Sequence, residues 1–151
     1  MPTEKDHATV ERLIHAEPSA VFDLITDPSR HVELDGSGQV RANQGPTGRL
    51  VLGSTFGMAM RFGIGYSVVN TVTEYDKDKR ISWQTRPTGL MGRFLGGRTW
   101  RYELEPAEGG TLVRETWDIS TEKVKAMVRP GRAMTVRSMT TTLARIDELL
   151  S

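Results

Sequence analysis

The chain has 151 residues, which is enough for one domain with a substantial core and gives no reason to expect a second. A formal net charge of +1, from 20 basic and 19 acidic residues, shows no overall preference for nucleic acid or an anionic membrane. The absence of cysteine excludes disulfides, thiolate nucleophiles and cysteine-ligated metal sites. The polar N-terminus does not resemble an apolar signal sequence, and no segment is long and apolar enough to span a bilayer. We therefore expect a single domain over residues 1–151 with a cytoplasmic location.

The first two predicted elements are separated by Pro18. In residues 10–15, Val10, Arg12 and Ile14 alternate with Glu11, Leu13 and His15. This alternation predicts a strand with two different faces. After Pro18, the apolar residues of the segment 21–25 gather on one side of a helical period. Proline fits a first helical turn because its missing N–H would have had no partner there. The sequence therefore opens with a strand followed by a helix.

Residues 28–54 are rich in Gly, Asn, Pro and Ser, and they predict turns around one short strand within DGSGQVRANQ. His31 lies in this region and is expected to be a solvated loop residue. The other two histidines, His7 and His15, are scattered over a tail and a strand end. The pattern forms no metal constellation or catalytic triad, so we expect neither a metal nor a cofactor.

Three hairpins follow, because apolar and polar residues alternate from Thr55 to residue 118 and are interrupted by turn residues. Around Gly63-Ile64-Gly65, the expected register pairs Phe62 with Tyr66, Met60 with Val68, Met58 with Asn70 and Phe56 with Val72. Around Lys77-Asp78, it pairs Val72 with Trp83 and Asn70 with Thr85. In the last hairpin it pairs Leu104 with Val113, Tyr102 with Glu115 and Trp100 with Trp117. One continuous inner face results.

From Thr121 to Leu150 the spacing is helical, with Met139, Leu143 and Ile146 in one stripe. The pair Pro130-Gly131 should break or kink this helix and leave a shorter helical piece before it. These elements predict an α+β helix-grip fold, in which a curved antiparallel sheet wraps around a long C-terminal helix. The opening strand can join the sheet beside the last strand, and its helix closes one end.

The segments VERLIHAEPSAVFDLITDP, GSTFGMAMRFG…NTVTEYDKDKRISWQT and WRYELEPAEGGTLVRETWDIS resemble the polyketide cyclase/dehydrase branch of the START/Bet v 1-like (SRPBCC) superfamily. The resemblance covers nearly the whole chain. It implies the helix-grip fold and a cavity between sheet and helix, in which members hold lipids, sterols, polyketides or plant hormones. Some members are cyclases, dehydratases or chaperone activators, so the resemblance implies the fold more strongly than any one function.

Residues on the inner face and the closing helix are the candidates for contact with a small hydrophobic ligand. Methionine is flexible and polarisable, which suits an irregular apolar ligand. The candidates are Met58, Met60, Phe62, Asn70, Trp83, Thr85, Arg98, Trp100, Trp117, Met127, Met134, Met139 and Leu143. The alternative is that the same aromatic and methionine residues fill an ordinary core.

Glu115 and Tyr102 are the candidate catalytic residues, because a carboxylate beside a phenol in an apolar cleft can serve as an acid or base. Burial would raise the pKa of Glu115, whereas Arg98 on the same face would lower it. The alternative is a structural ion pair or hydrogen bond. Likewise, Asn70 and Thr85 could orient a ligand carbonyl or simply bond to each other.

The segment PTGLMGRFLGG places four apolar residues among four glycines between two strands. Such a loop, spanning residues 88–97, is consistent with a lid over a cavity and equally with a loop packed on the kinked helix near Pro130. Apolar side chains there could also contact a membrane or a second subunit.

The sequence thus favours a protein that binds a polyketide, a lipid or an isoprenoid-like molecule, with cofactor-independent cyclase or dehydratase activity left open. A homodimer is also left open, whereas no nucleic acid partner and no integral membrane segment are expected. The competing hypothesis is a non-enzymatic interaction module of the chaperone-activator type with a filled core.

Overall fold

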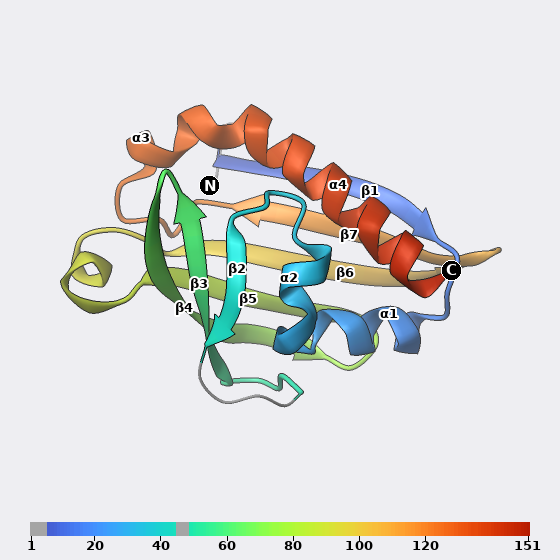
Figure 1. The fold of residues 1–151 in the computed structure, drawn as a ribbon. Coiled ribbons are helices and arrows are strands. Elements are labelled where there is room, and N and C mark those ends of the chain that lie inside the picture. Colours follow the sequence, from blue (N-terminus) through green and yellow to red (C-terminus); the bar gives the residue numbers. More distant parts are fainter. Residues whose placement is uncertain (1–5, 45–48) are drawn as a thin grey trace.

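The computed structural model describes residues 6–44 and 49–151, without the side chains of residues 41–44 and 62. Its described strands form one antiparallel sheet of seven, in the order β1-β7-β6-β5-β4-β3-β2 (Figure 1). The strands are β1 His7–Ile14, β2 Val40–Gln44, β3 Thr55–Phe62, β4 Ile64–Asp76, β5 Arg80–Pro87, β6 Arg98–Ala107 and β7 Gly110–Asp118. The expected α+β helix-grip fold is confirmed, and the opening strand lies beside the last one as predicted.

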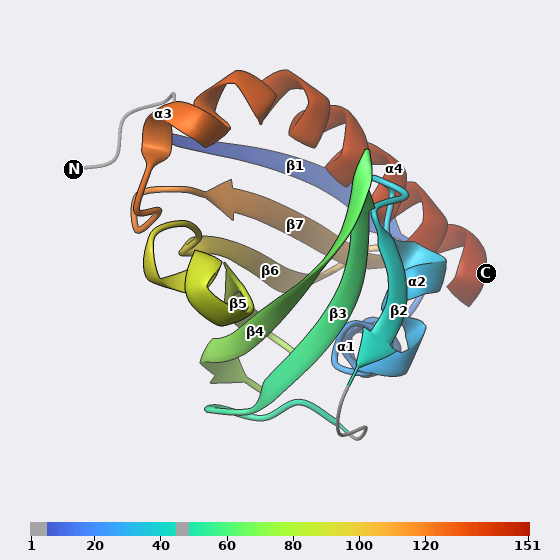
Figure 2. The same ribbon diagram turned by 60° about the vertical axis from the view of Figure 1, so that its left-hand side comes forward.

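The helices are α1 Pro18–Ile25, α2 His31–Leu34, α3 Lys125–Val128 and α4 Arg132–Leu150, with 3-10 turns η2 Pro28–Arg30, η3 Gly89–Arg93 and η4 Arg129–Gly131. Pro18 does begin α1, whose apolar side is buried. The predicted break at Pro130-Gly131 is confirmed too, because η4 separates the short α3 from the long α4. Figure 2 shows the sheet bending so that β2, β3 and β4 cross the direction of β1, β7 and β6.

The registers of the second and third hairpins match the sequence prediction. Val72 pairs with Trp83, and Tyr102 pairs with Glu115. The register predicted for β3 and β4 is wrong by two residues. Phe62 pairs with Ile64, Met60 with Tyr66, Met58 with Val68 and Phe56 with Asn70. Gly63 has a φ of 76°, which glycine adopts without strain, so the chain reverses around this single residue. An error of two leaves every side chain on its predicted face.

The segment from Pro28 to Leu34 is helical, although the sequence predicted only turns around a short strand there. Asp27 starts it, because its Oδ1 accepts hydrogen bonds from the Ser29 backbone N–H at 3.1 Å and the Ser29 hydroxyl at 2.5 Å. The short strand itself is present as β2. This helical segment covers the end of the main core.

Two apolar clusters lie between the sheet and α4. The larger cluster includes Phe22, Trp83, Tyr102 and Leu143. The smaller one holds Met139 of α4 against Ala8, Trp117 and Ile119. β1 brings Ala8 beneath the first half of α4, so this part of the interface is packed. Any space for a ligand must therefore lie away from the smaller cluster. Trp100 contacts both clusters, so it lies at the boundary between them.

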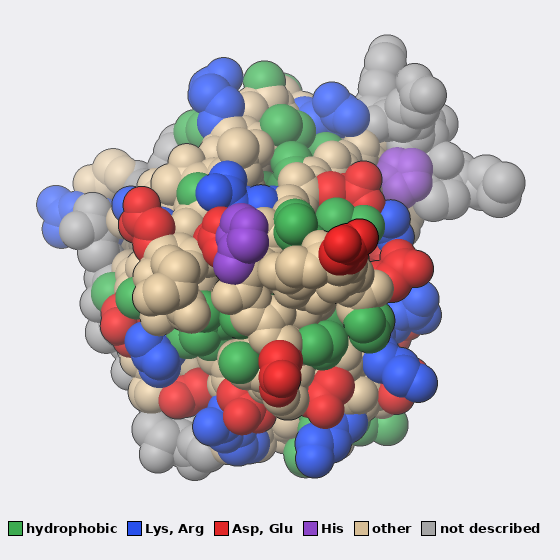
Figure 3. Space-filling view, turned by 90° about the vertical axis from the view of Figure 1, so that its right-hand side faces the viewer, with side chains coloured by type: hydrophobic (Ala, Val, Ile, Leu, Met, Phe, Trp, Pro, Cys, Tyr) green, Lys and Arg blue, Asp and Glu red, His purple; other side chains and the backbone are tan. Residues whose placement is uncertain are grey.

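The two ends of the molecule are formed by different elements. Figure 3 looks at the end that carries α1 and the last turn of α4, and acidic and basic side chains are interspersed there. The opposite end carries α3, η3 and the tip of the β3–β4 hairpin (Figures 1 and 2).

Candidate site on the concave face

Inward-pointing side chains form three rows across the concave face of the sheet, the face that packs on α4. Because paired residues in neighbouring strands lie side by side, the registers define these rows. The deep row is Ile81, Tyr102 and Glu115; the middle row is Val72, Trp83, Trp100 and Trp117; the outer row is Phe56, Asn70, Thr85 and Arg98. The structure therefore brings most of the predicted site residues of the strands onto one surface.

Glu115 and Tyr102 interact in the deep row as the sequence suggested. The Tyr102 hydroxyl donates to Glu115 Oε2 at 2.9 Å, and both side chains are buried. Glu115 Oε1 has no hydrogen-bond partner among the described protein groups. Burial raises the pKa of Glu115 to about 8, although the bond from Tyr102 acts in the opposite direction. Glu115 is therefore mostly protonated at neutral pH.

Arg98 does not neutralise Glu115. Its Nε lies 3.4 Å from Oε2 of Glu122, a buried residue just beyond β7. The sequence left open whether burial or Arg98 would dominate the pKa of Glu115, and burial does. The same burial, together with Glu115, holds the pKa of Tyr102 well above its usual value, so the phenol stays protonated.

His31 is buried, which contradicts the expectation of a solvated loop histidine. Its Nε2 lies 2.8 Å from the Ile25 carbonyl oxygen, and because a carbonyl only accepts, Nε2 carries the proton. The ring stacks on Trp83 at a centroid distance of 5.4 Å and meets Phe56 edge to face at 5.3 Å. Burial lowers the pKa of His31, so the imidazole is neutral and acts as part of the aromatic core. The prediction failed because helix α2 was missed.

Asn70 and Thr85 bond to each other across the outer row. The Thr85 hydroxyl donates to Asn70 Oδ1 at 2.5 Å, and Asn70 Nδ2 donates weakly to the Phe56 carbonyl oxygen at 3.4 Å. Of the two alternatives left open by the sequence, the structure shows the one in which Asn70 and Thr85 bond to each other. Such a pair leaves Thr85 half-exposed, with its hydroxyl oxygen free to accept a further bond.

The concave face is partly open to solvent at Trp100 of the middle row and beyond that row. Met60, Tyr66, Arg98 and Trp100 point inward by register, yet all four are only half-buried. Their neighbours deeper in the fold, such as Trp83, are buried. This part of the concave face therefore has a solvent-accessible surface made of aromatic, methionine and cationic side chains.

The remaining candidate residues fall into three groups. Met58 and Leu143 are buried in the main cluster, while Trp117 and Met139 are buried in the smaller one. Met134 and Met127 are exposed by 39% and 63%, so neither side chain lies in the interior. The Phe62 side chain lies outside the described residues. The sequence could not distinguish these places, because all the methionines follow similar strand or helix spacing.

The segment 88–97 is fastened to the chain before α3. The Gly96 N–H donates to Glu122 Oε1 at 2.9 Å, and Lys123 Nζ donates to the carbonyl oxygens of Gly92 at 2.7 Å and Arg93 at 3.0 Å. Its side chains Leu90, Met91 and Phe94 stay exposed, so they do not pack on the helix near Pro130. Glu122 was not among the predicted site residues. It is an acidic residue beside a basic stretch, and this contrast in charge could have indicated that it has a structural or binding role.

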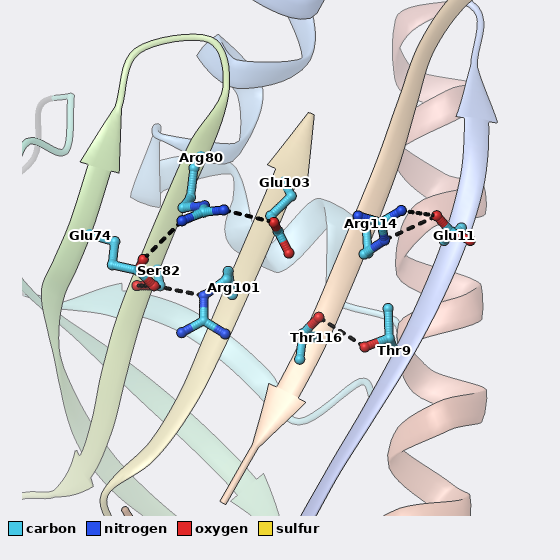
Figure 4. A network of polar contacts seen from close by, with 9 residues as sticks. All are labelled: Thr9, Glu11, Glu74, Arg80, Ser82, Arg101, Glu103, Arg114 and Thr116. Carbon is cyan, nitrogen blue, oxygen red and sulfur yellow. Dashed lines mark hydrogen bonds and ion pairs between the residues drawn. The ribbon is translucent and has the colours of Figure 1, made fainter. Parts of the chain in front are cut away.

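The outer face of the sheet carries paired charges (Figure 4). Arg80 lies 3.4 Å from Glu74 and 3.0 Å from Glu103, and Arg114 lies 2.6 Å from Glu11. A hollow of about 580 Å³ on this side is lined by Arg80, Glu103 and Arg114 among others. Arg80 and Arg114 are already paired with carboxylates, so neither guanidinium is free for a ligand in this hollow.

Two further properties follow from the described parts of the chain. Within residues 6–44 and 49–151, His, Asp and Glu side chains do not gather in any group of three that could hold a metal. In the same residues, every helix is too short or too polar to cross a bilayer.

Comparisons with known proteins agree with this fold. The family model for polyketide cyclase/dehydrase and lipid transport matches residues 5–150. An uncharacterized protein of Mycobacterium tuberculosis is 38% identical over 106 residues, which is 68% of this chain and 43% of that protein. The chain thus spans less than half the length of this curated relative.

Solved structures show the same fold at low identity. A protein from Chromobacterium violaceum superposes with a TM-score of 0.74 at 13% identity and covers 96% of both chains. A protein in the dynemicin biosynthetic locus superposes with a TM-score of 0.68 at 15% identity, covering 96% of this chain and 47% of its own.

Proposed function

The chain belongs to the polyketide cyclase/dehydrase and lipid transport family, and on this premise we propose that it binds a small hydrophobic or amphipathic ligand between the concave face and α4. The observation that supports this most is the half-buried state of Met60, Tyr66 and Trp100, which point into the fold. Large apolar side chains that face inward normally reach full burial, so their exposure marks a surface suited to an apolar molecule.

The polar groups at this surface favour an amphipathic ligand. Arg98 has a side chain 35% exposed and shares its partner Glu122 with the backbone of Gly96. A ligand carboxylate or carbonyl would bind the free N–H groups of Arg98, and a hydroxyl or carbonyl would bond to Thr85. The apolar body would lie against Met60, Trp100 and Met134. Polyketides, fatty acyl compounds and isoprenoid-like molecules share this combination of groups.

A fluorescent fatty acid or an anilinonaphthalene dye tests this proposal directly. Met60→Trp should fill the open part of the concave face and lower dye affinity at least about tenfold, because the added ring occupies the volume of the ligand. Val69→Trp is the matched control, since Val69 lies in β4 with its side chain on the outer face and 39% exposed. Both variants should keep a thermal midpoint near that of the wild type.

Equal dye binding by the wild type and both variants would place the dye elsewhere and contradict the proposed site. A protein that binds no apolar probe at all, and that carries no small molecule in native mass spectrometry after purification, would favour the alternative of an interaction module with a filled core.

A second candidate function is a cofactor-independent dehydration or cyclisation, and the protonated Glu115 favours it. A carboxylic acid with a pKa near 8 can give its proton to a hydroxyl group of the ligand as the C–O bond breaks and water leaves. The Glu115 carboxylate that remains would take a proton from the adjacent carbon, so that a C=C bond forms and the acid is restored. Tyr102 would hold the Glu115 carboxyl in place. Incubation with β-hydroxyketone compounds and mass spectrometry for loss of water tests this. Activity that survives in Glu115→Gln would exclude Glu115 as the acid.

A further inference from the structure

Acidic residues are absent from three long stretches of the sequence. Residues 36–73, 79–102 and 123–146 contain no Asp or Glu, although the whole chain has almost equal numbers of acids and bases. These stretches supply the β3–β4 tip, the segment 88–97 and α3 with the start of α4. Figures 1 and 2 place all three at the end of the molecule opposite that shown in Figure 3. The net charge of +1 therefore conceals a basic end.

Large apolar side chains protrude from the same three segments. Ile64 is 76% exposed at the β3–β4 tip, Leu90 and Phe94 are 67% and 64% exposed around η3, and Met127 is 63% exposed on α3. We call these four residues, together with Met91, the rim. These residues lie on three separate projections of the chain, so their side chains can contact one flat surface together.

The rim projections around η3 and α3 are held in place by hydrogen bonds. Glu122, Lys123 and Thr121 bind the backbone of the segment 92–97, as described for Gly96 and Gly92. Gly97 has a φ of 112°, and a Cβ there would overlap the Thr121 carbonyl oxygen, so only glycine allows this close approach. Leu90 and Phe94 are consequently presented to solvent by a fastened backbone.

Several cations beside the rim form no ion pair with the described acidic residues. Arg61, Arg86 and Arg93 form no ion pair within the described part of the chain. Lys123 binds backbone carbonyl oxygens, which leaves its charge in place. Two acids lie close by, and both are buried and already paired: Glu122 faces Arg98 at 3.4 Å, and Asp6 faces Arg129 at 2.8 Å. This surface therefore combines exposed apolar tips with uncompensated positive charge.

We propose that the rim docks on an anionic membrane surface, with Leu90, Met91 and Phe94 entering the interface and the cations facing lipid phosphates. Apolar side chains flanked by Lys and Arg are the combination that binds the boundary between headgroups and acyl chains. A second copy of this chain fits less well, because a two-fold contact would bring the same cations together. The rim surrounds the opening of the concave face, but docking does not depend on a bound ligand.

Sedimentation with vesicles tests the proposal on the purified 151-residue chain. The protein should bind vesicles of phosphatidylcholine with about 30% phosphatidylglycerol at low salt, bind pure phosphatidylcholine weakly, and lose affinity as salt rises. Leu90→Ser should lower the partition coefficient about tenfold, because one buried leucine side chain is lost. Leu52→Ser is the matched control, since Leu52 is 64% exposed on the segment 49–54, outside the rim.

Reversing the charge of single basic residues tests the electrostatic part of vesicle binding independently. Arg93→Glu should also lower binding about tenfold or more, whereas Lys79→Glu, in the turn between β4 and β5, should leave it nearly unchanged. Equal losses for Leu52→Ser and Leu90→Ser, or for both charge reversals, would overturn the proposal. So would the absence of vesicle binding by the wild type, or a Leu90→Ser effect on self-association in sedimentation velocity without an effect on vesicles.

The experiment separates docking from ligand binding. Met60→Trp, which should lower dye affinity inside the fold at least about tenfold, should still sediment with anionic vesicles. Loss of dye binding with retained docking, or the reverse, identifies which of the two proposals has failed.

Discussion

Glu115 combines deep burial with an incomplete set of hydrogen bonds. Among the described residues, one of its oxygens has a hydrogen-bond partner, the Tyr102 hydroxyl, and no cation forms an ion pair with it. A buried carboxylate in this position would be very unfavourable, and the side chain avoids that cost by keeping its proton. Its folded-state pKa of about 8 therefore exceeds the ordinary value of 4.5 for the unfolded chain.

This difference predicts that stability falls as pH rises. Below pH 4.5 both states are protonated, and between 4.5 and about 8 only the unfolded state releases the proton. The unfolded state is thereby favoured progressively, up to several kcal/mol, since one pKa unit corresponds to about 1.4 kcal/mol. Glu115→Gln replaces the neutral acid by a neutral amide, so this decline should disappear in urea unfolding measured across that range.

Glu105→Gln is the control for the Glu115 prediction, because Glu105 is exposed on β6 and should leave the pH dependence unchanged. A Glu115→Gln variant that retains the wild-type slope of stability against pH would show that Glu115 ionises normally in the folded protein.

Sequence patterns predicted which residues face inward better than which of those residues are accessible. Tyr102 was correctly paired with Glu115, because alternation fixes the face and the turn fixes the register. The pattern could not separate buried Met139 from exposed Met127, since both occupy helical stretches and differ only in what packs beside them. His31 was misplaced for the same reason: its burial comes from Trp83 and Phe56, distant in sequence.

At the scale of elements, α4 meets two different environments along its length. Its first half packs on β1 and β7 through Met139, and its second half packs in the main cluster through Leu143 and Ile146. The stripe predicted from helical spacing is correct, and within it Met139, a candidate for contact with a ligand, is buried in the smaller cluster. The edge strand β1 covers that position, and the position of β1 follows from a pairing between the two ends of the chain.

Met139→Trp should therefore overpack the smaller cluster and lower the free energy of unfolding by about 1 to 3 kcal/mol. Met134→Trp makes the same change on the same helix at a position that is 39% exposed, and it should cost much less. Chemical denaturation measures both. Equal stability of the two variants would show that the space beside Met139 is not filled.

The connection between α2 and β2 touches α4 through Gly36. Its N–H donates to the Thr142 hydroxyl at 2.7 Å, and a Cβ on Gly36 would overlap the Ser138 carbonyl oxygen and the Thr142 backbone. The sequence indicated a turn here but not this close approach, because glycine-rich turns are common at positions with no such contact.

Gly36→Ala should separate this connection from α4 and lower the free energy of unfolding by about 2 kcal/mol or more, as a steric clash with backbone has no cheap relief. Gly131→Ala, where a Cβ would meet nothing within 4 Å, is the control and should be close to neutral. A Gly36→Ala protein as stable as the control would mean that the α2–β2 connection is not held against the helix.

At the scale of the whole molecule, the order of strands and the closing helix could be predicted almost completely. Alternation of apolar and polar residues predicts the strands, and strands that follow one another in the chain usually pair. The distribution of charge could not be predicted from totals, because acids and bases nearly balance while the acid-free stretches meet only in the folded chain. The opening of the concave face is equally a property of the assembled sheet, since it depends on which inward side chains α4 leaves uncovered.

Photo-crosslinking shows most directly whether a ligand binds between the concave face and α4. A photoreactive fatty acid would be bound to the wild-type protein, irradiated, and located by peptide mass mapping. Adducts are expected on Met60, Trp100 and Met134, together with competition by an unlabelled fatty acid. Adducts confined to the outer-face hollow around Arg80 and Glu103, or labelling that unlabelled fatty acid does not compete away, would contradict binding on the concave face.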